Sequence, residues 1–217
     1  MSTADRELPL FPLKRVVLFP GMLLPLHIFE ERYKMMIASC QVSEAPFGVL
    51  LIRSGEEVGP AATPARIGCT ARLTRVDRFP DGTMDILAVG QHRFTLRETP
   101  RLAADGYLVA QARITTDEES ASQVPAQLAA DVAAEFRTYW AAVTERRRRG
   151  AASPGEIELP GAPVALSFHV AAGIRVDPLE QQQLLGIDDV TARLERELQL
   201  LRRENRPARM IGPFSVN

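Results

Sequence analysis

The residues from Leu8 to Phe29, LPLFPLKRVVLFPGMLLPLHIF, form the most apolar stretch of the chain, and prolines interrupt it throughout. A proline fixes φ and lacks the backbone N–H group, so no helix can run through this stretch. We therefore expect two short strands separated by a turn at Pro20-Gly21, with the prolines at strand starts or at edge positions. A segment that is this apolar must be buried. The first half of the chain must therefore supply the strands that pair with it in a sheet. The interrupting residues are Pro9, Pro12, Pro20, Gly21 and Pro25.

Further strand signals follow this stretch. Residues 47–52 form a buried-strand run, and residues 107–114 predict one more strand. Apolar and polar residues alternate imperfectly over 67–79 and 83–96, which flank a hairpin turn at Pro80-Asp81-Gly82 in which Gly82 takes positive φ. In the first of these strands Leu73, Val76 and Phe79 are expected to face the core and the arginines to face outward. Gly90 within the second of these strands indicates a bulge. Because closure removes exposed sheet edges, we expect a closed or half-closed barrel.

One short amphipathic helix is predicted within the first half, over residues 30–41, where apolar residues recur at three- and four-residue spacing. Beyond the polar stretch 115–123 the pattern is helical, over 124–149, 164–172, 177–186 and from a cap at Asp188 onward. We therefore predict an α+β fold: a barrel domain over residues 1–116, and a bundle of α-helices over 117–217.

The charge and cysteine content exclude several classes of protein. The formal net charge is −1, so the total charge does not indicate binding to nucleic acid or to an anionic membrane. Cys40 and Cys69 are far apart, which favours free thiols in a reducing compartment over a disulfide scaffold. No window approaches the roughly 20 apolar residues of a membrane span. We expect a cytoplasmic protein that binds no membrane.

No residue pattern predicts a catalytic or metal site. The three histidines, His27, His92 and His169, are far apart and show no paired ligand spacing. The adjacent carboxylates Glu118-Glu119 and Asp188-Asp189 fit a solvated linker and a helix cap better than an acid/base pair. We expect no cofactor and no metal.

Three segments together resemble the N-terminal substrate-binding domain of Lon proteases. They are LPLFPL at residues 8–13, VVLFPGMLLPLHIFEERY at 16–33, and IGCTARLTRVDRFPDGTMDILAVGQHRF at 67–94. DPLEQQQLLGIDDVTARLERELQLL at 177–201 is similar to the helical end of the same domain. The resemblance implies a PUA-like β pseudo-barrel with one inserted helix, followed by a C-terminal α-helical bundle, and it is weak only across residues 115–163.

A full Lon protease also has an ATPase module and a Ser-Lys protease module. A Walker A loop needs a Gly-Lys pair to hold phosphates, and neither lysine, Lys14 or Lys34, follows a glycine. Both lysines also lie in the part that resembles the non-catalytic domain. The expectation is therefore a free-standing binding domain, not an enzyme, which recognises exposed apolar or unfolded protein segments, with a protease or a chaperone as a candidate partner.

The apolar side chains around the Pro-Gly turn and the predicted helix start are the candidate binding patch. Met35 and Met36 cannot both face the core of a regular helix, so at least one of them is expected to be exposed. Methionine and aromatic side chains suit the binding of varied apolar segments. The alternative, that all but one of these residues belong to the core, stays open. The candidate residues are Phe19, Met22, Phe29, Tyr33, Met35 and Met36.

One concentrated run of charge, Arg146, Arg147, Arg148 and Arg149, ends the long predicted helix. There it complements the negative end of the helix dipole. It is also a candidate basic patch for RNA, because PUA domains proper bind RNA. With a net charge of −1 we do not expect nucleic acid as the partner, and RNA binding is kept as the alternative function.

Overall fold

The computed structural model describes residues 5–54, 63–115, 124–147 and 157–210. The chain divides into two compact units. The first, the barrel unit, combines Met1–Thr116 with Val176–Gly186, and the second, the helical unit, combines Asp117–Arg175 with Ile187–Asn217. The division predicted from the sequence placed residues 177–186 with the helices, whereas in the structure they group with the strands.

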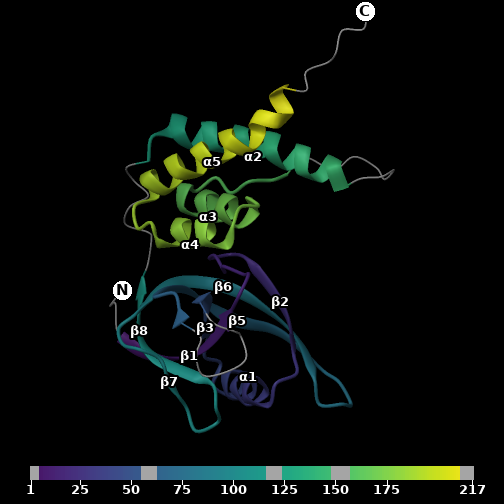
Figure 1. Cartoon of the computed structure of the whole chain (residues 1–217), viewed down its shortest axis with the longest axis vertical. Helices are drawn as coiled ribbons and strands as arrows, with labels where there is room; N and C mark the ends of the chain where they lie inside the picture. The colour runs from purple at the N-terminus through teal and green to yellow at the C-terminus, as the bar shows by residue number, and fades with distance from the viewer. Residues whose placement is uncertain (1–4, 55–62, 116–123, 148–156, 211–217) are drawn as a thin grey trace, which may run out of the picture. The chain divides into compact units, whose positions relative to one another are not determined.

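Five strands of the barrel unit close on themselves (Figure 1). The strands follow the order β2-β6-β5-β3-β1-β8-β7, and an additional pairing of β6 with β8 closes the ring. The predicted α+β fold with a closed barrel is thereby confirmed. The strands are β1 (Asp5–Leu13), β2 (Leu23–Ile28), β3 (Phe47–Ser54), β4 (Thr63–Pro64), β5 (Ile67–Arg78), β6 (Met84–Leu96), β7 (Arg101–Leu102) and β8 (Leu108–Thr115).

The prolines of the first stretch lie where a strand has a partner on one side only, as predicted. Residues 5–10 of β1 pair with β8, and residues 10–13 pair with β3. Pro9 therefore precedes the β3 pairing and Pro12 follows the β8 pairing. Pro25 lies on β2, which among the described strands pairs with β6 alone. A missing N–H group is tolerated at such positions.

The predicted Pro20-Gly21 turn is present and lies against β6. Met22 N donates to Phe19 O at 3.0 Å, and Gly21 has φ +79°, which makes this a type II turn. Gly21 N donates to Gly90 O, and Gly90 N donates to Met22 O, both at 2.9 Å. The register of β6 shifts just beyond Gly90, where a bulge was predicted.

The hairpin between β5 and β6 turns at Pro80-Asp81-Gly82, as predicted. Gly82 has φ +81°, and Asp81 Oδ1 accepts hydrogen bonds from the N–H and the hydroxyl of Thr83 at 2.9 and 2.7 Å. One expectation for this hairpin is wrong. Phe79 was placed in the core, but it follows the last residue of β5 and is 42% exposed.

Helix α1 (Glu31–Ser43) buries Tyr33, Met36, Ile37 and Cys40, which is the predicted stripe. Helix α4 (Pro178–Gly186) begins as its sequence predicted, because Asp177 Oδ1 accepts from Leu179 N at 2.8 Å.

Buried Arg93 connects the barrel to α4. Its NH1 group donates to Leu185 O at 3.0 Å, and Gln182 Nε2 donates to Ile67 O at 3.0 Å. Arg93 is buried at the bulge of β6, where it satisfies a carbonyl at the end of α4.

The helical unit contains α2 (Ala126–Arg147), α3 (Pro163–Gly173) and α5 (Val190–Met210). An apolar stripe of α5 is buried throughout, at Val190, Leu194, Leu198 and Leu201. The predicted cap is wrong by one residue, because Asp189 rather than Asp188 accepts from Ala192 N, at 2.7 Å. The described residues contain no helix with the length and apolar character that crossing a bilayer requires.

A polar cluster lies inside the helical unit. Arg193 Nε donates to Ser167 Oγ at 2.7 Å, and Ser167 Oγ donates to Glu197 Oε1 at 2.8 Å. The Arg193 guanidinium also lies 4.1 Å from the ring centroid of Phe168. All three polar residues are fully buried, so this cluster joins α3 to α5 without contact with water.

Candidate functional site

A cavity of about 580 Å³ opens at one side of the barrel. Strand β8 begins at Leu108, opposite Leu10 of β1, so among the described strands β1 has no partner on that side beyond Leu10. The cavity lies beside this part of β1, and segments that are far apart in the sequence line it. The cavity is lined by Pro12, Arg32, Tyr33, Thr63, Pro64, Arg66, Leu96, Arg97, Glu98, Thr99, Pro100, Leu102 and Leu108.

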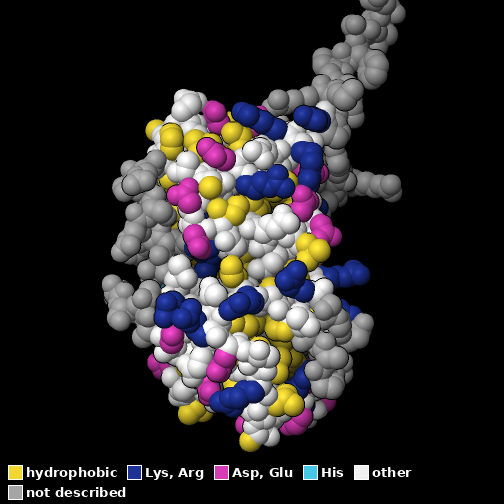
Figure 2. Space-filling view, turned by 60° about the vertical axis from the view of Figure 1, so that its left-hand side comes forward, with side chains coloured by type: hydrophobic (Ala, Val, Ile, Leu, Met, Phe, Trp, Pro, Cys, Tyr) yellow, Lys and Arg dark blue, Asp and Glu magenta, His cyan; other side chains and the backbone are white. Residues whose placement is uncertain are grey.

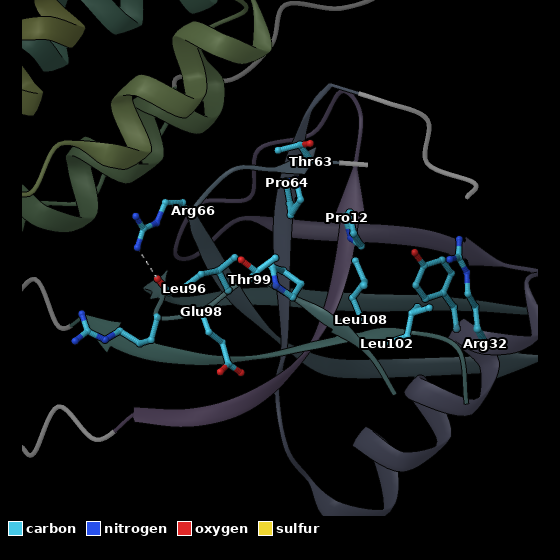
Figure 3. A pocket seen from close by; sticks show the side chains of 13 residues that line it. Pro12, Arg32, Thr63, Pro64, Arg66, Leu96, Glu98, Thr99, Leu102 and Leu108 are labelled. Atoms are coloured by element: carbon cyan, nitrogen blue, oxygen red, sulfur yellow. Dashed lines mark hydrogen bonds between the residues drawn. The ribbon is translucent and has the colours of Figure 1, made fainter. Parts of the chain in front are cut away.

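The central part of the cavity is apolar. Figure 3 shows Pro12, Pro64 and Leu108 close together, with Leu102 beside them. Leu102 is 59% exposed, although a leucine is usually buried. On the barrel unit, Figure 2 shows a gathering of apolar side chains among Lys and Arg side chains. Such a surface suits an apolar ligand more than it suits water.

Tyr33 forms one wall and links the cavity to the core. Its ring stacks on Phe11 with a centroid separation of 4.2 Å, and the Arg32 guanidinium lies 4.6 Å from the Tyr33 ring centroid. Glu30 Oε2 accepts from Arg32 Nε at 2.9 Å. These contacts hold the arginine in place at this end of the cavity.

Ion pairs and hydrogen bonds at the opposite end fix the segment that follows β6. Arg97 N donates to Gln111 O at 2.8 Å, and Glu98 Oε1 accepts from Gln111 N at 3.0 Å. Arg97 Nε also lies 3.6 Å from Asp5 Oδ2. The hydrogen bond from Arg113 lowers the pKa of Asp5, so its carboxylate stays ionised beside these arginines.

The arrangement offers binding surface rather than reactive groups. Within the described residues, no three His, Cys, Asp or Glu side chains come together as a metal site. The histidines lie in separate surroundings: His27 Nδ1 is 2.7 Å from Asp85 Oδ1, and His169 meets the Phe136 ring edge-on. The cavity can hold an apolar group between arginine side chains.

The patch predicted from the sequence is only partly at the surface. Phe19, Tyr33 and Met36 are buried, so they cannot form an open patch, and Met22 is half-buried. These residues complete the barrel core, which needs large apolar side chains under the Pro-Gly turn and under α1. Phe29 is 63% exposed and Met35 is 48% exposed, as predicted for at least one of the two methionines.

The exposed Phe29 lies outside the cavity. Its ring centroid is 6.4 Å from that of His27, and His27 is equally far from Phe79. Of the six predicted residues, Tyr33 alone lines the cavity, and it does so as a wall.

The predicted basic run falls mostly outside what the structure describes. Arg146 and Arg147 belong to the last turn of α2, but their side chains are not described. Arg148 and Arg149 lie outside the described residues. The candidate RNA-binding patch therefore stays a prediction.

Comparison with known proteins supplies the family. Residues 7–203 match the family model described as "ATP-dependent protease La (LON) substrate-binding domain". The chain belongs to the Lon substrate-binding domain family. The Lon protease of Roseiflexus castenholzii is 32% identical over 202 residues, which are 91% of this chain and 24% of that protein. The Lon protease of Xanthomonas oryzae is 32% identical over 196 residues, or 87% of this chain and 22% of that protein.

Two solved structures agree with the Lon-domain assignment. The crystal structure of a Lon N-terminal domain protein from Xanthomonas campestris matches with a TM-score of 0.67 and 25% identity, covering 89% of this chain and 98% of that one. The N-terminal domain of the Mycobacterium avium complex Lon protease matches with a TM-score of 0.59 and 19% identity, covering 91% and 98%, and supports the fold alone. The match to the Lon substrate-binding domain family does not favour the RNA-binding alternative.

Sequence reasoning missed most of the residues that line the cavity in this Lon domain. Pro64, Leu102 and Leu108 belong to three different strands, and no periodic pattern links them. One local signal was available: Thr99-Pro100 breaks the chain directly after β6, which marks a surface turn.

Proposed function

We propose that the barrel unit binds exposed apolar segments of unfolded or partly folded proteins. The observation that carries this proposal is the cavity of about 580 Å³ with apolar side chains at its centre, one of which, Leu102, is 59% exposed. Exposed leucine in a hollow surface is costly in water, and the cost is offset when another apolar side chain covers it. An extended segment can place one or two side chains there.

The family supports a protein as the ligand. The chain spans about a quarter of the length of the curated relatives it matches, and those relatives are named as proteases. We propose that these residues contribute binding without catalysis, and that a protease or chaperone partner supplies ATP-driven unfolding and cleavage. Cys40 and Cys69 are buried and form no disulfide, which fits a protein of the reducing cytoplasm.

A binding measurement with a matched pair of variants tests the proposal. The probe is a reduced, carboxymethylated protein that cannot fold, carrying a fluorescent label for anisotropy titration. Leu102→Asp puts a charge into the cavity and should weaken binding about tenfold. Leu179→Asp is the control, because Leu179 is similarly exposed, at 52%, but does not line the cavity.

The control variant should bind the unfolded probe as the unchanged protein does. Thermal melting establishes that both variants fold, as expected for substitutions at exposed positions. If Leu102→Asp and Leu179→Asp lose affinity equally, the unfolded probe does not bind specifically in the cavity. Absence of binding by the unchanged protein at high micromolar concentration would contradict the proposal itself.

A further inference from the structure

The cavity carries more positive than negative charge. Three arginines and one glutamate line it. Arg32 is paired with Glu30, at 2.8 Å between NH2 and Oε2, and Arg97 Nε lies 3.6 Å from Asp5 Oδ2. Arg66 differs from both, because its hydrogen bond, from NH2 to Leu96 O at 3.4 Å, is to an uncharged carbonyl group.

The two ends of the cavity therefore differ in charge balance. In Figure 3, Arg66 and Arg32 lie at opposite ends, with Pro12, Pro64 and Leu108 between them. At the Arg32 end a carboxylate of the chain already neutralises the guanidinium. At the Arg66 end no described carboxylate of the chain forms an ion pair with the guanidinium.

The proline residues of the lining cannot form hydrogen bonds to a ligand through a backbone N–H group. Pro12, Pro64 and Pro100 have no backbone N–H group to donate to a ligand. A polar group of a bound segment must therefore find its partner elsewhere in the lining, where Arg66 carries a charged donor group and Tyr33, Thr63 and Thr99 carry neutral hydroxyl groups. A guanidinium binds a carboxylate through two parallel hydrogen bonds, which a single long bond to a carbonyl leaves available.

Taking the proposed function as given, we propose that this cavity selects apolar protein segments that carry an aspartate or glutamate next to the apolar residue. The carboxylate pairs with Arg66, and the apolar side chain lies on Pro12, Pro64 and Leu108. An acidic segment complements the Arg66 guanidinium, whereas a basic segment brings a like charge close to it. Arg66 is thus a specificity-determining residue of the binding site.

Two labelled peptides test the proposal directly. They share one apolar sequence and differ in a single position, glutamate in one and glutamine in the other. The unchanged protein should bind the glutamate peptide about three- to fivefold more tightly at low salt, and added salt should reduce this ratio. Arg66→Gln should abolish the preference and leave the affinity for the glutamine peptide unchanged.

Arg72→Gln is the matched control, since Arg72 is exposed on β5, carries the same charge and does not line the cavity. It should keep the preference, which separates a local ion pair from a change in net charge. Equal binding of the two peptides, with both weakened by Leu102→Asp, would overturn the selection of acidic segments and leave the proposed function standing. Retention of the preference in Arg66→Gln would also overturn it.

The result is different if the barrel unit does not bind apolar protein segments at all. In that case neither peptide binds, the unfolded probe protein does not bind either, and Leu102→Asp has no effect to measure.

Discussion

The carbonyl oxygen of Phe19 lies 2.2 Å from the position that a Cβ atom on Gly90 would take. The first turn of the chain and the middle of β6 therefore approach each other as closely as two backbones can. Hydrogen bonds from Gly21 N to Gly90 O and from Gly90 N to Met22 O hold them together at 2.9 Å each. A glycine is required here because a side chain would force the two segments apart.

Replacing Gly90 with alanine should therefore destabilise the barrel. The clash is with backbone, which cannot rotate away, and overpacking of this kind costs about 1–3 kcal/mol in the free energy of unfolding. Urea denaturation followed by circular dichroism measures this free energy. Gly161→Ala is the control, because no described atom outside its two chain neighbours lies within 4 Å of the added Cβ, and it should change stability by less than about 0.5 kcal/mol. Equal stability of the two variants would contradict the close approach.

Glu197 should make the stability of the protein depend on pH. Burial raises its pKa well above the ordinary value of 4.5, which outweighs the lowering by the Ser167 hydrogen bond and the Arg193 charge. The folded protein then keeps a proton that the unfolded chain releases. The free energy of unfolding should therefore fall as pH rises from 4.5 through the folded-state pKa.

Glu197→Gln should remove this fall, because glutamine stays neutral at every pH. The measurement is the free energy of unfolding in urea at several pH values between about 4 and 8. Glu195→Gln, at an exposed position of the same helix, should keep the pH dependence of the unchanged protein. If Glu197→Gln and the unchanged protein show the same slope, the carboxyl group is not held protonated in the fold.

The thiols should be unreactive in the folded protein. Cys40 and Cys69 are both buried, and burial raises the pKa of the Cys40 thiol to about 11. Because the thiolate is the reactive form, an aromatic disulfide reagent at pH 8 should label almost no cysteine. In denaturant the same reagent should label both cysteines of the chain. Rapid labelling in native buffer would show that α1 opens readily.

Phe29 remains the most exposed residue of the patch predicted from the sequence. Phe29→Ala should change the free energy of unfolding by less than about 0.5 kcal/mol, because a side chain that is 63% exposed contributes little to packing. If Phe29 contacts bound segments, the variant should bind the unfolded probe about fivefold more weakly. Met35→Ala provides the same test at the second exposed position. Unchanged affinity in both would confine binding to the cavity.

Local rules explain why the fold was predictable. Proline removes the possibility of a helix, and Pro12 and Pro25 then have to lie where a strand lacks one neighbour. Pro20-Gly21 and Asp81-Gly82 supply the two turns because only glycine adopts positive φ at no cost. Each of these signals acts within about four residues, so a sequence displays it directly.

The cavity was not predictable because it depends on closure of the barrel. Leu102 and Leu108 approach Pro12 and Pro64 only after β8 pairs with β1. Buried polar residues were missed for a related reason. Arg93 and Arg193 follow surface-like patterns, and only their partners, the Leu185 carbonyl and the Ser167 hydroxyl, explain the burial.

Photocrosslinking tests most directly whether apolar segments bind in the cavity. A photoreactive amino acid replaces Thr99, an exposed residue of the lining, and Arg137, an exposed residue of α2, serves as the control position. After irradiation with the unfolded probe, mass spectrometry identifies the crosslinked peptides. We predict crosslinks from position 99 to apolar segments of the probe, with few from position 137. Equal crosslinking at the two positions, or none at position 99, would contradict the account.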